Sequence, residues 1–133
     1  MVHVLIFNKQ KEIGLQLRAK NKDFCPGRWL TSVGGYVLAG ETYEQAAHRE
    51  MKEEVGVDLP IKLFSKDIYY NTRQNLRKFL KIYKAYYDGI FKVEIDKVDR
   101  IEFFHLEKVK EMLINDEDKF HPELSFILKK YFY

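Results

Sequence analysis

Apolar residues recur along this chain with two spacings, one typical of strands and one typical of helices. Ile13, Leu15 and Leu17 alternate with small or polar residues, which is the pattern of a half-buried strand. Other runs are continuously apolar or rich in Ile, Phe and Tyr, as buried strands are. Strands are therefore predicted at residues 2–7, 13–18, 29–37, 61–70, 78–87 and 98–104, with a short strand-like extension at 91–93.

Three other segments place apolar residues at helical spacing. The first helix is predicted to begin after Thr42, which forms a T-x-x-Q capping box with Gln45, and to end at Gly56, a natural C-terminal stop. Two more helices are predicted at 106–114 and 122–133, the latter with Pro122 in its first turn. The paired glycines Gly34 and Gly35 interrupt a strand pattern, which indicates a bulge or a close approach of the backbone to a ligand.

Length and composition indicate an ordinary globular domain. The 133 residues are expected to form a single domain, 1–133, with mixed α and β structure. Aromatic residues make up 15% of the chain, which favours substantial sheet. The formal net charge of +3 is too small to indicate a nucleic-acid polymer as partner, but it is compatible with a small anionic substrate.

The single cysteine, Cys25, cannot form an intramolecular disulfide, so a reducing, cytoplasmic compartment is expected. Met1 leads directly into a short apolar run with no basic segment before it, and this run is too short to span a membrane. Neither a signal peptide nor a membrane anchor is therefore predicted.

Three glutamates crowd one face of the first predicted helix. Glu50, Glu53 and Glu54 fall within an arc of about 100°, because an α-helix turns roughly 100° per residue. Each like-charge pair costs about 0.2–0.5 kcal/mol, and the helix dipole disfavours anions in the last turns. A solvated acidic face is the ordinary explanation for such a cluster. The functional explanation is that a divalent cation compensates the charge.

The residues around these glutamates resemble a known motif, the Nudix box G-x5-E-x7-R-E-U-x-E-E-x-G-U, in which U is a bulky aliphatic residue. A chance match of this length is well below roughly one in a million at typical residue frequencies. All constrained positions are filled, by Gly35, Glu41, Arg49, Glu50, Met51, Glu53, Glu54, Gly56 and Val57. The flanking segments P-G-R-W-L-T-S-V-G-G-Y-V and F-H-P-E-L-S-F-I-L-K-K-Y are similar to the branch of the family that is related to isopentenyl diphosphate isomerase.

This resemblance implies a Nudix-type α/β/α sandwich with a mixed, curved sheet, the box helix on one side and the C-terminal helices on the other. It implies hydrolysis of a diphosphate linkage, in a nucleoside diphosphate derivative or a related small diphosphate, with Mg²⁺ or Mn²⁺. The implied metal ligands are the Gly35 carbonyl and the carboxylates of Glu50, Glu53 and Glu54. Magnesium prefers such oxygen ligands.

Further roles follow from the same resemblance. Glu50, Glu53 and Arg49 are the expected catalytic group, in which Arg49 fixes the rotamer of Glu50 or Glu53. Glu41 is expected to steady the start of the helix. Glu50 is the preferred general base. The alternative is a later loop, residues 92–100, which contains Glu94, Asp96 and Asp99 but carries Lys97 where relatives often have a glutamate.

Substrate contacts are expected from Arg18, Lys20 and Gly34. For the cations of residues 19–28, among them Lys20, Lys22 and Arg28, a solvated loop is an equally good explanation. The aromatic-rich strands could stack on a base, but sheet packing explains them better. The tyrosines concerned are Tyr69, Tyr70, Tyr83 and Tyr87.

Two other functions fit the resemblance. Isomerases of the related branch use a cysteine just before the position of Gly34, where this chain has Val33, and Cys25 is expected to be an inert thiol. A non-catalytic nucleotide-binding module is the second alternative. The expected partner is a small diphosphate, and the chain is expected to be a monomer or homodimer, away from membranes. The histidines are all interpreted as structural; they are His3, His48, His105 and His121.

Overall fold

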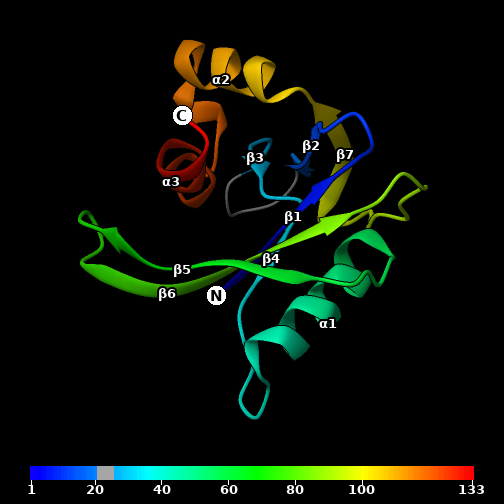
Figure 1. Cartoon of the computed structure of the whole chain (residues 1–133). Helices are drawn as coiled ribbons and strands as arrows, with labels where there is room; N and C mark the ends of the chain where they lie inside the picture. Colours follow the sequence, from blue (N-terminus) through cyan, green and yellow to red (C-terminus); the bar gives the residue numbers. More distant parts are fainter. Residues whose placement is uncertain (21–25) are drawn as a thin grey trace.

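A computed structural model describes residues 1–20 and 26–133 of the chain. Its elements alternate strands and helices around one sheet (Figure 1). The strands are β1 (Val2–Phe7), β2 (Ile13–Arg18), β3 (Trp29–Leu30), β4 (Val33–Gly35), β5 (Lys62–Asn71), β6 (Leu76–Tyr86) and β7 (Val98–Phe104). The helices are α1 (Tyr43–Val55), α2 (Leu106–Asn115), α3 (Pro122–Tyr131) and the 3₁₀ turn η1 (Glu117–Lys119). Lys22 and Cys25 lie outside the described residues.

The sheet is mixed, as predicted. Its main order is β3-β2-β1-β6-β5, with β4 also pairing β1 and β7 also pairing β2. β1 and β6 are parallel, and the other pairs are antiparallel. Helix α1 covers one face, and α2 and α3 lie together on the other, so the molecule has the three layers of the predicted sandwich (Figure 1).

The apolar side chains of β1 explain the three layers. Side chains alternate across a strand, so Val2, Val4 and Ile6 pack beside α1 while Leu5 and Phe7 pack beside α2 and α3. All five are buried, at 7% relative exposure or less. β1 is therefore the central strand of two hydrophobic cores, which accounts for its nearly continuous apolar sequence.

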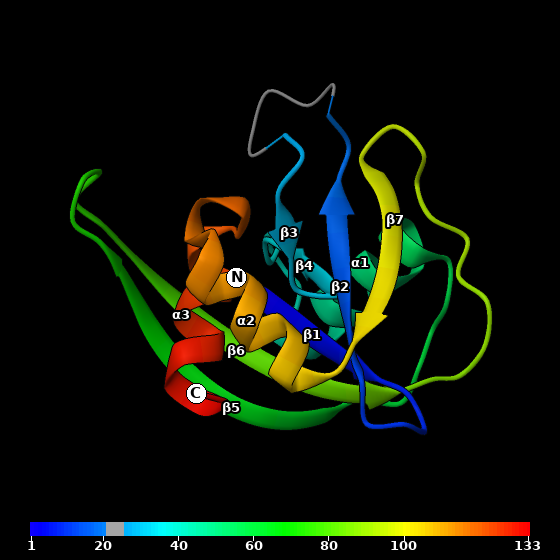
Figure 2. The ribbon, with the colours of Figure 1, turned by 90° about the horizontal axis from the view of Figure 1, so that it is seen from above.

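The predicted strand at 29–37 is wrong as one element, because it divides into β3 and β4. β3 pairs with β2 at Gln16 and Leu17, whereas β4 pairs with β1 over Val2–Val4. β1 and β2 pair with each other only at Phe7 and Ile13 and then diverge. The segment β3–β4 fills the opening between them (Figure 2).

Ser32 lies where the two strands part. Its hydroxyl accepts a hydrogen bond from the Ile6 backbone N–H at 2.8 Å and donates one to the Gly14 carbonyl. Both bonds are buried, so this one side chain replaces ladder bonds that the diverging strands cannot make to each other. The fork opened in this way forms the wall of the main cavity described below.

The strand-like extension predicted at 91–93 is also wrong, since residues 87–97 form a connection without strand structure. This connection docks on the end of α1: Lys92 N–H donates to the Val55 carbonyl at 3.0 Å and Glu94 N–H to the Glu54 carbonyl at 3.0 Å. The predicted capping box of Thr42 and Gln45 is present, and Gly56 ends α1 with a φ of 71°. None of the helices in the described part of the chain is both long and apolar enough to cross a membrane.

Candidate active site

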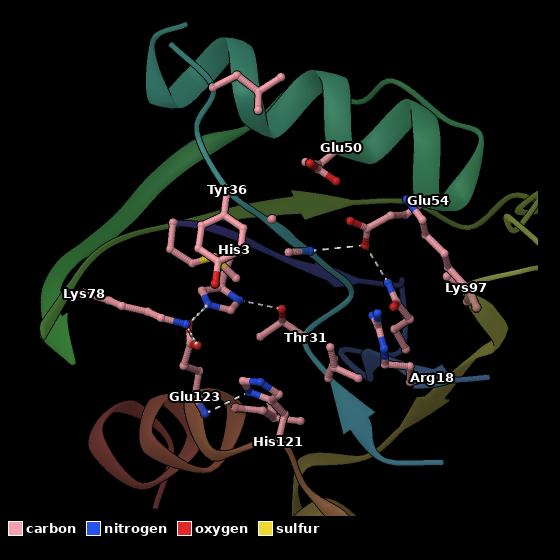
Figure 3. Close-up of a pocket in the computed structure, with 18 residues that line it drawn as sticks. His3, Arg18, Thr31, Tyr36, Glu50, Glu54, Lys78, Lys97, His121 and Glu123 are labelled. Atoms are coloured by element: carbon pink, nitrogen blue, oxygen red, sulfur yellow. Dashed lines mark hydrogen bonds and ion pairs between the residues drawn. The ribbon is translucent and has the colours of Figure 1, made fainter. Parts of the chain in front are cut away.

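A cavity of about 340 Å³ opens at the fork between β1 and β2, beside α1 and the start of α3 (Figure 3). Its lining brings together residues from both ends of the chain. Acidic side chains come from α1 and α3, and cations come from β2, β6 and the connection before β7. The charged and glycine residues that line it are Arg18, Gly34, Gly35, Glu50, Glu54, Lys78, Lys97 and Glu123.

Two of the three crowded glutamates face this cavity. Glu54 is only 9% exposed and accepts hydrogen bonds from the Gln16 side chain at 2.7 Å and the Gly34 N–H at 3.4 Å. Burial raises its pKa well above the usual range, and a hydrogen bond to Glu50 raises the pKa further. Glu50 and Glu54 therefore form a close, mostly buried pair of carboxyl groups, of which Glu50 pairs with Arg49 and Glu54 forms no ion pair among the described residues.

The backbone of β4 passes directly beneath this pair. A Cβ placed on Gly35 would overlap the side-chain carbons and a carboxylate oxygen of Glu50. Glycine at this position is therefore what lets Glu50 lie against the strand. The paired glycines had predicted a bulge or a close approach to a ligand, whereas the close neighbour of Gly35 in the described structure is a side chain of the protein itself.

Arg49 holds the loop before α1 and the acidic face together. Its Nε and one terminal nitrogen bind both carboxylate oxygens of Glu41, at 2.6 and 3.0 Å. A terminal nitrogen also donates to the Tyr36 carbonyl at 3.0 Å. The other terminal nitrogen bonds Glu50 at 2.7 Å and Glu53 at 3.3 Å. With every donor direction used, Arg49 is placed to orient carboxylates rather than to reach a substrate.

Glu41 has the position predicted for it. Its carboxylate accepts the Leu38 N–H at 2.9 Å, which closes the turn that leads into α1. The hydrogen bonds from Arg49 and Leu38 lower the pKa of Glu41. The carboxylate therefore stays ionised and fixes Arg49 relative to β4.

Glu53 is placed differently from the other two. Its side chain is half-exposed, pairs with Arg49 and is not among the residues that line the cavity. Within the described residues, no three acidic, histidine or cysteine side chains already converge on one point. The donor set still suits a hard divalent cation, because buried carboxylate oxygens and an adjacent strand backbone are the ligands such a cation takes.

The expected substrate contacts are only partly brought together. Arg18 and Gly34 line the cavity, whereas Lys20 is exposed and does not. Arg18 Nε is buried and has no hydrogen-bond partner among the described residues. A buried, unsatisfied guanidinium nitrogen at a cavity wall is suited to meet an anionic ligand.

The loop considered for a second general base is occupied with other contacts. Glu94 pairs with Lys97 at 3.2 Å, and this hydrogen bond raises the pKa of Lys97. Asp99 pairs with Arg100 at 2.8 Å. Asp96 is exposed and outside the cavity lining. Of this loop, only the cation Lys97 and the neighbouring Val98 reach the cavity.

Sequence reasoning missed the opposite wall of the cavity. His3 bonds Thr31 at 2.8 Å and Glu123 at 3.0 Å through its two ring nitrogens, and Lys78 bonds the second oxygen of Glu123 at 3.0 Å (Figure 3). Burial alone would raise the pKa of Glu123, but the bonds and charges of His3 and Lys78 outweigh it and lower the pKa to about 2. The sequence feature that could have indicated this wall is His3, a polar residue in the otherwise apolar strand β1.

Two further side chains complete that wall. Tyr36 follows β4, is 62% exposed, and lies with its ring 5.4 Å from Lys78 Nζ. His121 caps α3, accepting the Glu123 N–H on Nδ1 at 3.1 Å. The prediction that His121 has a structural role agrees with this cap, although its ring also lines the cavity.

Known proteins are similar to this chain over most of its length. The NUDIX domain model matches residues 1–124. The chain belongs to the Nudix family. It is 30% identical over 117 residues to an uncharacterized Nudix hydrolase of Listeria innocua, covering 88% of this chain and 69% of the relative. It is 35% identical over 108 residues to Nudix hydrolase 3 of Arabidopsis thaliana, covering 80% of this chain and 14% of that protein.

The predicted branch is also consistent with a second relative. The chain is 29% identical over 123 residues to isopentenyl-diphosphate Delta-isomerase 2 of Photorhabdus laumondii, covering 86% of this chain and 67% of that protein. A crystal structure of DR0079 from Deinococcus radiodurans superimposes with a TM-score of 0.84 at 24% identity, covering 99% of this chain and 82% of that one. This structural match confirms the predicted fold.

Proposed function

We propose that this Nudix protein hydrolyses a diphosphate linkage, in a nucleoside diphosphate derivative or a related small diphosphate, with Mg²⁺ or Mn²⁺. The observation that carries the proposal is the buried Glu50–Glu54 pair, which faces the same cavity as Arg18, Lys78 and Lys97. Two carboxyl groups this close favour a bound cation, because the single charge of Arg49 on Glu50 leaves Glu54 uncompensated, and cations across a cavity suit phosphate oxygens.

The residues that would hold the metal are Glu50, Glu53 and Glu54 with the Gly35 backbone. A bound divalent ion would neutralise diphosphate charge and lower the pKa of water. Glu53 would take part through its half-exposed carboxylate, of which Oε2 contacts Arg49 at 3.3 Å while no contact of Oε1 with Arg49 competes for the ion.

Residues of the chain itself would accept the proton and bind the phosphate groups. Glu50 accepts the proton of the attacking water, since its carboxylate borders the cavity and is held in place by Arg49. Arg18 binds a phosphate oxygen through its unpaired Nε. Gly34 places backbone beside the substrate. Lys20 contributes charge only at longer range, since it is outside the lining.

The test is hydrolysis of a diphosphate panel by the wild-type protein and by Glu53→Gln and Glu54→Gln variants. Each substitution removes a proposed ligand, so the rate should fall by more than about a hundredfold. Glu44→Gln is the matched control, since it removes an exposed carboxylate from the first turn of the same helix. Unchanged rates in both variants would refute the proposed metal site.

Isomerisation of isopentenyl diphosphate is the alternative that the Photorhabdus relative favours. Val33, at the position where isomerases of the related branch use a cysteine, is fully buried in the core beside α1. No thiol is therefore available there to move a proton. Isotope exchange into isopentenyl diphosphate would revive this alternative, and tight nucleotide binding without turnover would favour a non-catalytic module.

A further inference from the structure

A second cavity, of about 440 Å³, lies beside the candidate active site at the base and tip of the β5–β6 hairpin. The two cavities share three lining residues, Lys78, His121 and Glu123. The remaining lining comes from Arg28, Pro122 and residues 69–74. The two cavities therefore adjoin at the Lys78–Glu123 ion pair.

The second cavity has an unbalanced positive charge. Arg28, Arg73 and Lys78 line it, and the one acidic lining residue, Glu123, is 1% exposed and already neutralised by His3 and Lys78. Among the described residues, neither Arg28 nor Arg73 forms an ion pair. Two arginines that face a cavity without counter-ions are suited to bind a phosphate or carboxylate.

The hairpin tip that carries Arg73 has a defined backbone. The Asn71 side chain accepts the N–H groups of Arg73 at 3.1 Å and Gln74 at 3.3 Å, which closes the turn. At the other end of the cavity, the Tyr69 ring packs edge-on against Phe126 at 5.4 Å. The cavity thus has a fixed aromatic wall on one side and a cationic turn on the other.

We propose that the second cavity is an anion subsite that binds a further phosphate on the organic part of the substrate, beyond the diphosphate that is cleaved. The substrate class is then a diphosphate whose nucleoside or equivalent moiety carries an additional phosphate at its far end. This inference rests on the proposed function for the position of the diphosphate, since the subsite adjoins the cavity in which the diphosphate would bind.

Equilibrium binding tests this subsite without requiring turnover. The probes are adenosine 5′-monophosphate and the adenosine 2′,5′- and 3′,5′-bisphosphates, measured by calorimetry. One bisphosphate should bind at least about tenfold more tightly than the monophosphate, as one charge-assisted contact allows. The preference should disappear in Arg73→Ala and Arg28→Ala, with monophosphate affinity unchanged.

Arg77→Ala is the matched control. Arg77 belongs to the same hairpin, but its side chain lies over the Phe79 ring and does not line the cavity. The bisphosphate preference should survive this change. Arg73 is exposed, so its variant tests the subsite even if Arg28→Ala destabilises the fold.

The outcomes separate this inference from the proposed function. The subsite would be overturned if the three probes bound with equal affinity or did not bind. It would also be overturned if the bisphosphate preference fell equally in the Arg73 and Arg77 variants. Hydrolysis of diphosphates without any preference for a second phosphate would also overturn it, while keeping the proposed function. Selective bisphosphate binding by a protein that hydrolyses nothing would support the subsite and refute the proposed function.

Discussion

At the scale of single residues, glycine decides how closely the acidic helix approaches the sheet. Glu50 occupies the space that a side chain at position 35 would need. The same carboxylate is held from the other side by Arg49 at 2.7 Å. Glu50 is therefore confined between a backbone and a guanidinium, which gives it one orientation toward the cavity.

Gly35→Ala should consequently displace Glu50 and lower the proposed hydrolytic rate by about a hundredfold, since a small misplacement at a reacting centre has effects of this size. The free energy of unfolding should also decrease, because overpacking costs about 1–3 kcal/mol. In a Glu50→Ala background the overlap is gone, so the Gly35 substitution should have almost no further effect on stability. Urea denaturation of the four proteins measures this coupling; additive losses would show that Glu50 does not confine position 35.

Sequence alone predicted this residue-level geometry in part. The Nudix box predicted Glu50, Glu54 and Gly35 as site residues and Arg49 as their organiser, and the structure brings them together because those contacts are local to one loop and helix. Lys78 and Glu123 were not predicted as cavity residues. Their positions depend on strands and helices that meet only in the folded chain, 45 residues apart in sequence.

At the scale of elements, the divergence of β1 and β2 creates the cavity. Periodicity predicted both strands but merged β3 with β4, since a pattern of apolar residues does not reveal a change of partner. The partner changes at Thr31 and Ser32, two buried polar residues between the short strands. Buried hydroxyls in such a segment need hydrogen-bond partners. The Ser32 hydroxyl finds them on both β1 and β2, and so holds the two strands where they diverge.

Ser32→Ala should therefore lower the free energy of unfolding by about 3 kcal/mol, because it leaves the Ile6 N–H and the Gly14 carbonyl buried and unpaired. Urea denaturation at neutral pH gives this value. Thr72→Ala removes an exposed hydroxyl from the hairpin turn and should be neutral. A loss below about 1 kcal/mol in the Ser32 variant would mean that the fork does not depend on this hydroxyl.

At the scale of the whole molecule, His121, which lines the cavity and caps α3, makes the free energy of unfolding depend on pH. Burial lowers the pKa of His121 to about 4, so the ring stays neutral in the folded protein and caps α3. Of the titratable neighbours, Glu123 opposes this lowering of the pKa, and His3, Lys78 and Arg28 add to it. The unfolded chain binds a proton near the ordinary pKa of about 6.5, whereas the folded chain does so only near 4.

Stability should accordingly fall as the pH drops. The contribution of neutral His121 is fully present above the unfolded pKa and is lost as the pH falls toward 4, by about 2 kcal/mol between pH 7 and pH 5. Glu123, with its pKa of about 2, adds a second loss only below the ordinary glutamate pKa. His121→Asn keeps a capping side chain that does not titrate, so urea denaturation at pH 7 and 5 should show a smaller loss. Equal losses in both proteins would exclude His121 as the source.

The parallel pairing of β1 with β6 has a consequence for how the protein is made. Val2 pairs with Lys81 and Phe7 with Tyr86, so β1 leaves the ribosome about 80 residues before its main partner, β6. Domains gain such long-range pairings late, and unpaired apolar strands favour aggregation in the meantime. The cavity wall that contains His3, Lys78 and Glu123 can form only after β1 has paired with β6 and α3 has packed against the sheet. A nascent chain would therefore contain all of α1, with its three glutamates, well before the cavity could form.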